Sequence, residues 1–167
     1  MGVKWKTKKD DFPKIKATLE RIDGKKVSVG VLGGGEQAWL AGIHEYGCRI
    51  EVTDKMRKYL AATGLYLKKT TTHIVIPERA FLRNGYDENK DEVIDKAEAV
   101  LKDVLNGTMS ETQLFEIVGL LLKSKIQDYA RDLDSPPNHP YTVERKGSSN
   151  PLVDSGSMIG AIDYKVE

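Results

Sequence analysis

The sequence has a single cysteine, almost no net charge and no long apolar run. Because Cys48 stands alone, an internal disulfide is excluded, and a reducing compartment such as the cytosol is expected. The 26 basic and 25 acidic residues leave a formal charge of +1, which removes the simplest electrostatic argument for nucleic acid as an obligate partner. No apolar run approaches the roughly 18 residues of a membrane span, and no apolar segment follows the basic start. We therefore expect neither membrane association nor export by a signal peptide.

The length of 167 residues predicts one domain that buries roughly 68–70% of its unfolded surface and needs no metal or disulfide for support. Charge is unevenly placed along it. Residues 87–98 are rich in acid, and two regions are rich in base: Lys4, Lys6, Lys8 and Lys9, and then Lys55, Arg57, Lys58, Lys68 and Lys69. Solvated faces explain these clusters most simply. A nucleic-acid-binding module, with binding that weakens steeply in salt, is an alternative that the basic regions leave open.

Hydrophobic periodicity predicts an α+β fold with a small, mainly antiparallel sheet packed against two long helices and several shorter ones. Period-two alternation, or β-branched composition, predicts strands near 26–32, 71–76 and 161–166. Helical spacing predicts short helices after Pro13, over 36–46 and from Thr53 or Asp54, followed by two long helices. The first long helix closes at Asn106-Gly107. The second begins at a capping box of Ser110 and Gln113 and runs to about Leu133.

From Ser135 to Asn150 the periodicity disappears into proline, glycine, serine and asparagine. That composition predicts a mobile loop, close to the greatest length at which loops occur in compact domains. We expect one α+β domain over residues 1–167 with a mobile loop at about 135–150.

Residues that could carry chemistry are few. The loop Gly30–Gly35 lies between a strand and a helix, where phosphate-binding loops occur, but it lacks a Gly-Lys-Ser/Thr ending, and Glu36 puts a negative charge where the phosphate would sit. His44 is followed by glutamate as in a zinc-protease helix, yet the second histidine is replaced by Cys48. We therefore assign no catalytic, cofactor-binding or metal-binding residue and expect no cofactor. A small nucleotide- or metal-binding enzyme that uses Gly30–Gly35 and His44 is the alternative.

Three motifs remain, and the first two have a plain structural reading. In Leu40–Gly47, Ile43 and Tyr46 are expected to pack inward while Gly47 lets the chain turn left-handed. In Ile76–Arg83, Pro77 ends a strand, and Phe81 and Leu82 anchor the next helix. The second motif also places Arg79 and Arg83 four residues apart on one helical face. These arginines are expected to pair with carboxylates, either of a neighbouring subunit or within the chain.

The third motif, Pro151–Ile162, contains a turn followed by a short apolar segment. The Asp154 side chain is expected to accept hydrogen bonds from nearby backbone N–H groups, and Gly156 to supply the turn conformation. Met158, Ile159 and Ile162 follow at helical spacing before the closing strand, which predicts that this segment is docked. Ser155 is interpreted as a turn residue and not as a nucleophile.

In this order, the three motifs resemble the tail-completion or head-tail joining proteins of tailed bacteriophages. In that family a helix ends in His-Glu-Phe/Tyr-Gly, a Pro-x-Arg-x-Phe-Leu-Arg segment enters the long helices, and an Asp-Thr/Ser-Gly turn precedes the final strand. Relative to shorter members, residues 53–72 are interpreted as an insertion. The resemblance implies that the motif residues are interface candidates: His44, Glu45, Tyr46, Gly47, Pro77, Arg79, Phe81, Leu82, Arg83, Asp154, Ser155 and Gly156.

What the resemblance implies is a structural, non-catalytic role in virion morphogenesis at the neck or tail end. The expected partners are other neck and tail proteins and copies of the chain itself in a ring, hexameric in the virion, with passive contact to DNA in transit and no membrane. The expected location is the virion, and the host cytoplasm during assembly. The loop at 135–150 would be an arm that becomes ordered on assembly.

Overall fold

The computed structural model describes residues 11–167; the lysines predicted as a basic amino-terminal region, Lys4, Lys6, Lys8 and Lys9, lie outside them. In chain order the elements are α1 (Phe12–Ile22), β1 (Val27–Val31), α2 (Glu36–Tyr46), β2 (Cys48–Glu51), α3 (Asp54–Ala62), β3 (His73–Ile76), α4 (Phe81–Asn106), α5 (Glu111–Asp132), α6 (Pro140–Lys146), α7 (Ser157–Gly160) and β4 (Ile162–Val166). The predicted α+β class is confirmed.

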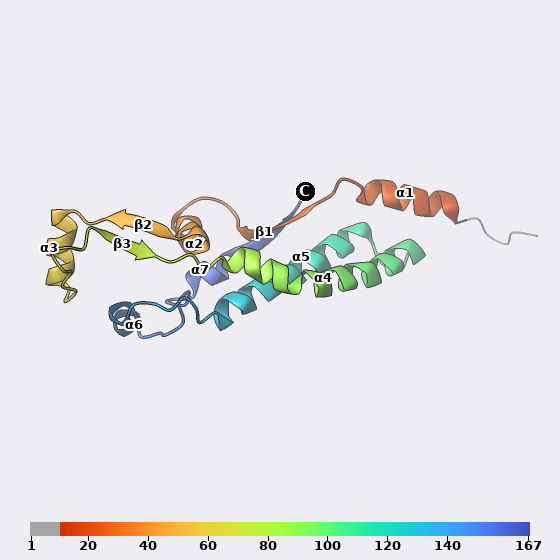
Figure 1. The fold of residues 1–167 in the computed structure, drawn as a ribbon. Helices are drawn as coiled ribbons and strands as arrows, with labels where there is room; N and C mark the ends of the chain where they lie inside the picture. The colour runs from red at the N-terminus through yellow and green to blue at the C-terminus, as the bar shows by residue number, and fades with distance from the viewer. Residues whose placement is uncertain (1–10) are drawn as a thin grey trace, which may run out of the picture.

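The long helices α4 and α5 form an antiparallel pair that is the body of the molecule (Figure 1). The connection between them is short, and the end of α4 and the start of α5 are both capped. Gly107 is left-handed, and its N–H donates back to carbonyls in the last turn of α4. Ser110 and Gln113 form the predicted reciprocal capping box, which satisfies N–H groups that the first turn of α5 would otherwise leave without partners.

The strands form two separate two-stranded antiparallel sheets and not one, which corrects the single sheet expected from the sequence. β1 pairs with β4 and lies along α5, and Lys26 and Glu167 extend the ladder with backbone hydrogen bonds of 2.8 and 2.9 Å. β3 pairs with β2 instead, in register from Cys48 opposite Ile76 to Glu51 opposite His73. Strand β2 was not predicted from the sequence, because it has only four residues and two of them are charged.

Residues 53–72, interpreted as an insertion, connect β2 to β3 and contain α3. The Thr53 side chain accepts from Met56 N at 3.2 Å, as a helix cap should. Arg57, a member of the second basic region, holds the segment that leads from α3 to β3 by donating to the carbonyls of Lys68 and Thr71 at 2.9 and 2.7 Å. The segment is therefore a structured end to the hairpin, and one of its cations serves internal hydrogen bonds.

The main core lies where α5, α4, α7 and β4 meet. Phe81 and Ile162 are completely buried, and they belong to a cluster that contains Ile126, Met158 and Ile159. The predicted docking of the closing segment is confirmed by this burial. A smaller second cluster of Val100, Val104 and Leu114 packs at the far end of the helical pair, against α1.

The segment 135–150, expected to be an irregular loop, contains helix α6. The His139 ring accepts from Tyr141 N at 3.2 Å, Pro140 occupies the first turn, and Gly147 ends the helix in a left-handed conformation. The expectation of irregular structure is therefore wrong for 140–146, because a seven-residue helix is too short for apolar periodicity to identify it. The Tyr141 hydroxyl also contacts Thr63 Oγ1 at 2.9 Å, which ties this segment to the end of α3.

Figure 1 shows an elongated molecule with the β2–β3 hairpin and α3 at one end and α1 at the other. Within residues 11–167, no helix combines the length and apolar character that crossing a membrane requires.

Candidate functional site

The first two motifs meet where α2 ends and α4 begins. Arg79 N donates to His44 O at 2.8 Å, which continues the pairing of β2 with β3 toward α2. Gly47, with φ of +73°, makes the turn between α2 and β2 as predicted. A Cβ at this position would lie 2.9 Å from Glu78 N and 3.0 Å from Ile76 O, so only glycine allows the two chain segments this close.

The Glu45 carboxylate caps helix α4 across a distance of 37 residues in sequence. Glu45 is 3% exposed, and its two oxygens accept from Leu82 N at 2.9 Å and from Arg83 N at 3.2 Å. These are N–H groups in the first turn of α4, which has no side-chain cap of its own. A carboxylate there also interacts favourably with the positive end of the helix dipole. The first motif therefore holds the start of the helix that the second motif begins.

Arg83 is paired within the chain. Its Nε donates to Glu45 Oε1 at 2.8 Å, one terminal nitrogen donates to Glu78 Oε1 at 2.7 Å, and the guanidinium lies 5.1 Å from the Tyr46 ring centroid. Both carboxylates hold the pKa of Arg83 above its ordinary value, chiefly through these hydrogen bonds. Tyr46 was expected to pack inward; it is 70% exposed instead, and its ring contacts the half-exposed Arg83 side chain and not the core.

The two arginines of the second motif do not share a helical face, contrary to expectation. Helix α4 begins at Phe81, after Arg79, and Ala80 between them has φ of +45°. A non-glycine residue in this left-handed region costs roughly 1–2 kcal/mol. This conformation at Ala80 separates the two side chains, so that Arg83 pairs with Glu45 while Arg79 contacts the segment before α6.

Arg79 is 4% exposed and has only neutral partners. Its Nε donates to Pro136 O at 3.1 Å, and its two terminal nitrogens contact His44 Nδ1 at 2.8 Å and Asn138 Oδ1 at 3.0 Å. Among residues 11–167, no carboxylate lies within ion-pair distance of this guanidinium. Burial lowers the pKa of Arg79 because the charged form loses hydration.

His44 is held as a neutral ring. A guanidinium can only donate, so His44 Nδ1 must be the acceptor and the ring proton lies on Nε2. Burial, together with the nearby charges of Arg79 and Lys146, lowers the pKa of His44 to about 4. The ring therefore carries no charge at neutral pH.

The third motif closes onto the other two through α7, which packs against α2. Gly156 has φ of +81° as expected for its turn. Ser155, and not Asp154, accepts the hydrogen bond from a nearby backbone N–H: within the described chain, Ser157 N donates to Ser155 Oγ at 3.4 Å. Asp154 acts instead through its charge on Lys146. Pro77 follows β3 as predicted, and Leu82 packs half-buried against the main core.

The residues that sequence reasoning missed are Glu78, Pro136, Asn138, His139 and Lys146. Glu78 is inside the second motif, but it lies before α4 and five residues from Arg83, so no helical charge spacing marks it. The others lie more than fifty residues from the arginine they surround, in the segment expected to be irregular, and no local pattern marks them.

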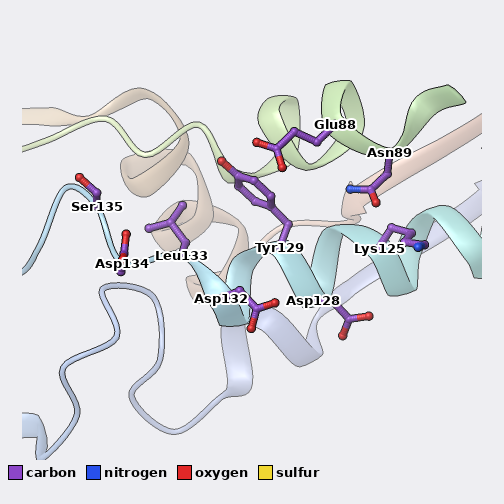
Figure 2. A pocket seen from close by; sticks show the side chains of 9 residues that line it. All are labelled: Glu88, Asn89, Lys125, Asp128, Tyr129, Asp132, Leu133, Asp134 and Ser135. Carbon is purple, nitrogen blue, oxygen red and sulfur yellow. The ribbon is translucent and has the colours of Figure 1, made fainter. Parts of the chain in front are cut away.

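An acidic hollow between α4 and α5 is the other candidate. It has a volume of about 540 Å³ and is lined by Glu88, Asn89, Lys125, Asp128, Tyr129, Asp132, Leu133, Asp134 and Ser135. Figure 2 shows that its carboxylates diverge: Asp128 and Asp132 point to the side opposite Tyr129 and Glu88. Over residues 11–167, no group of three or more His, Cys, Asp or Glu side chains is arranged to hold a metal ion. The hollow therefore presents acid to solvent without a converging ligand set.

The alternative function, a nucleotide- or metal-binding enzyme, depends on a glycine loop and His44 that have separate structural roles. Gly30 belongs to β1, and the loop proper is Leu32–Gly35, with Gly33 and Gly35 at positive φ. His44 lies at the other end of α2 with Nδ1 occupied by Arg79, which leaves only Nε2 for any ligand. The structure does not bring the loop and the histidine together.

No protein-family model matches this chain, and neither a characterised protein nor a solved structure matches it. The resemblance to phage proteins therefore remains a prediction that depends on the three motifs and on what their residues do in this structure.

Proposed function

We propose that this protein is a structural, non-catalytic component of a tailed-phage particle that completes the tail or joins it to the head, as part of a ring of copies at the neck. The observation that carries the proposal is the convergence of the motifs. Residues 40–47 and 76–83 form one network of hydrogen bonds, and residues 151–162 dock α7 onto the same helix α2. We call this meeting point of the three motifs the joint. A structural protein that works through its surfaces is expected to use its motifs in this way, to hold its elements in fixed positions.

This joint fixes the β2–β3 hairpin relative to the helical body. The hairpin projects from that body and ends in α3 (Figure 1), and its two strands leave their outer edges unpaired within the described chain. Large side chains are exposed on the hairpin segment, namely Tyr59, Tyr66 and Val75, and on the preceding helix α2, namely Trp39 and Tyr46. Tyrosine and tryptophan are enriched at the centres of protein interfaces. A projecting, aromatic hairpin is suited to contact a neighbouring copy or another neck protein.

Heterologous contacts, in which different patches meet, produce rings when the rotation closes. The chain carries distinct patches of opposite charge: the acidic hollow between α4 and α5, and the lysines around α3. Complementary charge sets orientation and association rate more than affinity. This distribution supports assembly of copies in one direction around an axis.

Two observations test the proposal. Genes for a portal, a capsid protein and a tail tube should lie beside the gene for this chain. In a phage that carries it, deletion should leave DNA-filled heads and finished tails unjoined, as seen by negative-stain electron microscopy, and the gene supplied in trans should restore joined particles. Arrest before DNA filling, or normal particles after deletion, would contradict the proposed role.

A matched pair of variants makes the complementation test specific to surface contacts. Tyr66→Ser removes an aromatic ring that is 80% exposed at the end of the hairpin, and Ile94→Ser removes an apolar side chain that is 51% exposed on α4. Both should leave the fold intact, because surface substitutions rarely change stability by more than about 0.5 kcal/mol. We expect only the first to reduce the yield of joined particles. Equal yields from the two variants would remove the hairpin from the assembly surface.

A further inference from the structure

A small pocket beside the joint carries an uncompensated positive charge. It has a volume of about 230 Å³ and lies against strand β3, and its polar lining is His44, Arg79, Asn138, His139 and Thr142. Pockets for drug-sized molecules are larger, roughly 300–1,000 Å³. The space suits a small ion or a single functional group.

The guanidinium of Arg79 belongs to this pocket, because two of its hydrogen-bond partners, His44 and Asn138, line it too. A guanidinium has five N–H donors, and three of them are engaged here. The residue is 4% exposed, and its guanidinium forms no ion pair with a carboxylate among residues 11–167. A buried charge without a counter-ion is unfavourable, so an anion in this pocket would stabilise the protein.

The other arginine of the motif, Arg83, has the opposite surroundings. Arg83 is half-exposed, where water would stabilise its charge, yet it has two carboxylate partners. Arg79, from the same motif, is buried and has none. Lys146, which is positive, acts on His44, and Asp154 acts on Lys146. Every charge that acts appreciably on His44 is positive.

Asn138 is already engaged, since its Oδ1 accepts from Arg79 and its Nδ2 donates to Pro151 O, and the two histidines and Thr142 are the remaining polar side chains with N–H or O–H groups. Both histidines accept a hydrogen bond at Nδ1, from Arg79 and from Tyr141 N, so the neutral form of each ring carries its proton on Nε2. Thr142 adds a hydroxyl. A guanidinium flanked by imidazole N–H and hydroxyl donors is the chemistry that recognises carboxylate and phosphate groups.

We propose that the pocket lined by His44, Arg79, Asn138, His139 and Thr142 binds a small oxyanion, either free phosphate or the carboxylate of another chain. The site stands independently of the role in phage assembly, since it depends only on the charge and the donors described above. Phosphate and carboxylate share the recognition chemistry, and the experiment separates them.

The test is anion-dependent thermal stability and isothermal titration of the full-length protein with inorganic phosphate, with acetate and with a short peptide that ends in a free carboxylate. Sodium chloride at matched ionic strength is the reference. We expect phosphate or a carboxylate to raise the melting temperature and chloride to leave it unchanged, because a ligand of the folded state stabilises it by mass action. Binding of phosphate alone identifies the free ion; tighter binding of the peptide than of acetate identifies another chain.

Arg79→Gln should weaken the anion at least about tenfold, because a hydrogen bond to a charged group typically contributes 1.5–3 kcal/mol. Arg131→Gln is the matched control, since that guanidinium is 51% exposed and paired with Asp128. If Arg79→Gln fails to fold, Thr142→Glu tests the same idea by placing a carboxylate at the pocket. It should raise the melting temperature in anion-free buffer and abolish the response to added anion, whereas Thr142→Gln should do neither.

A spectroscopic readout separates ligand binding from a purely structural role for Arg79. An anion in the pocket would raise the pKa of His44, and the His44 ring resonances should titrate at higher pH with saturating anion than in chloride. The proposal is overturned if the wild-type protein responds equally to chloride and to oxyanions, or if Arg79→Gln and Arg131→Gln respond alike.

Discussion

Glu45→Gln tests whether the carboxylate at the end of α2 holds the start of α4. Glutamine has nearly the same shape, so packing is retained while the negative charge and one acceptor oxygen are lost. The remaining oxygen can accept from one of the N–H groups of Leu82 and Arg83, and the new amide group faces the other donor. At a site where the wild-type residue is 3% exposed, water cannot replace the missing acceptor.

The magnitude follows from these contacts. One buried N–H left unsatisfied costs about 1–3 kcal/mol, and replacing a charge-assisted hydrogen bond by a neutral one costs about 1 kcal/mol more. The Arg83 side chain is 51% exposed and keeps Glu78, so no stranded buried charge is added. We expect a loss of about 2–4 kcal/mol in the free energy of unfolding. For a chain of this size, that loss lowers the melting temperature by roughly 5–15 °C.

Urea denaturation followed by circular dichroism measures the loss, and hydrogen exchange localises it. The amides of Leu82 and Arg83 should lose protection, because the first N–H groups of a helix have no partner within it. The amide of Gln113, capped by Ser110 at the start of α5, is the internal control. Glu78→Gln removes an exposed carboxylate from the same guanidinium and should cost no more than about 0.5–1 kcal/mol. Equal losses from the two variants, or unchanged exchange at Leu82, would refute the capping argument.

Three further changes have expected outcomes. Gly47→Ala should destabilise by more than about 2 kcal/mol in urea denaturation, because the added methyl group meets the Glu78 backbone at a positive φ. Gly119→Ala should destabilise the wild-type protein, because its methyl group overlaps the Tyr164 ring, yet stabilise a Tyr164→Ala background by up to about 1 kcal/mol through helix propensity. Because the pKa of His44 is lowered from 6.5 to about 4, the unfolded chain binds the proton more readily, so stability should fall as pH drops through that window, by about 1–2 kcal/mol after solvent screening. That loss, measured by denaturation at several pH values, should be absent from His44→Gln.

The elements that the sequence predicts well are those whose signals are local. α2 begins and ends where glutamate and glycine predict it, and the caps at Thr53 and Ser110 act as expected. The pairing of the strands was not predictable in this way. β1 joins β4 across 130 residues and β3 joins β2, and nothing within either strand of a pair indicates which partner it takes.

The candidate site shows the same division. The motifs identified His44, Glu45, Arg79 and Arg83, but periodicity placed the arginines on one helix face. The error comes from Ala80, whose left-handed backbone separates them, and alanine gives no sequence signal for that conformation. The surroundings of Arg79 come from residues 136–146, where composition indicated only a loop.

The two arginines of one short motif therefore have separate physical roles. Arg83 completes an ion-pair network whose carboxylates lie within the chain, so its loss should change stability whether or not an anion is present. Arg79 is buried without a carboxylate, so its contribution should depend on what is dissolved or docked at the pocket. Substituting each arginine with and without saturating phosphate separates these terms, because distant independent sites add while coupled ones do not. If the anion is a free carboxylate on another chain, docking of that chain would supply the charge that Arg79 lacks, and the protein would gain stability only in the complex.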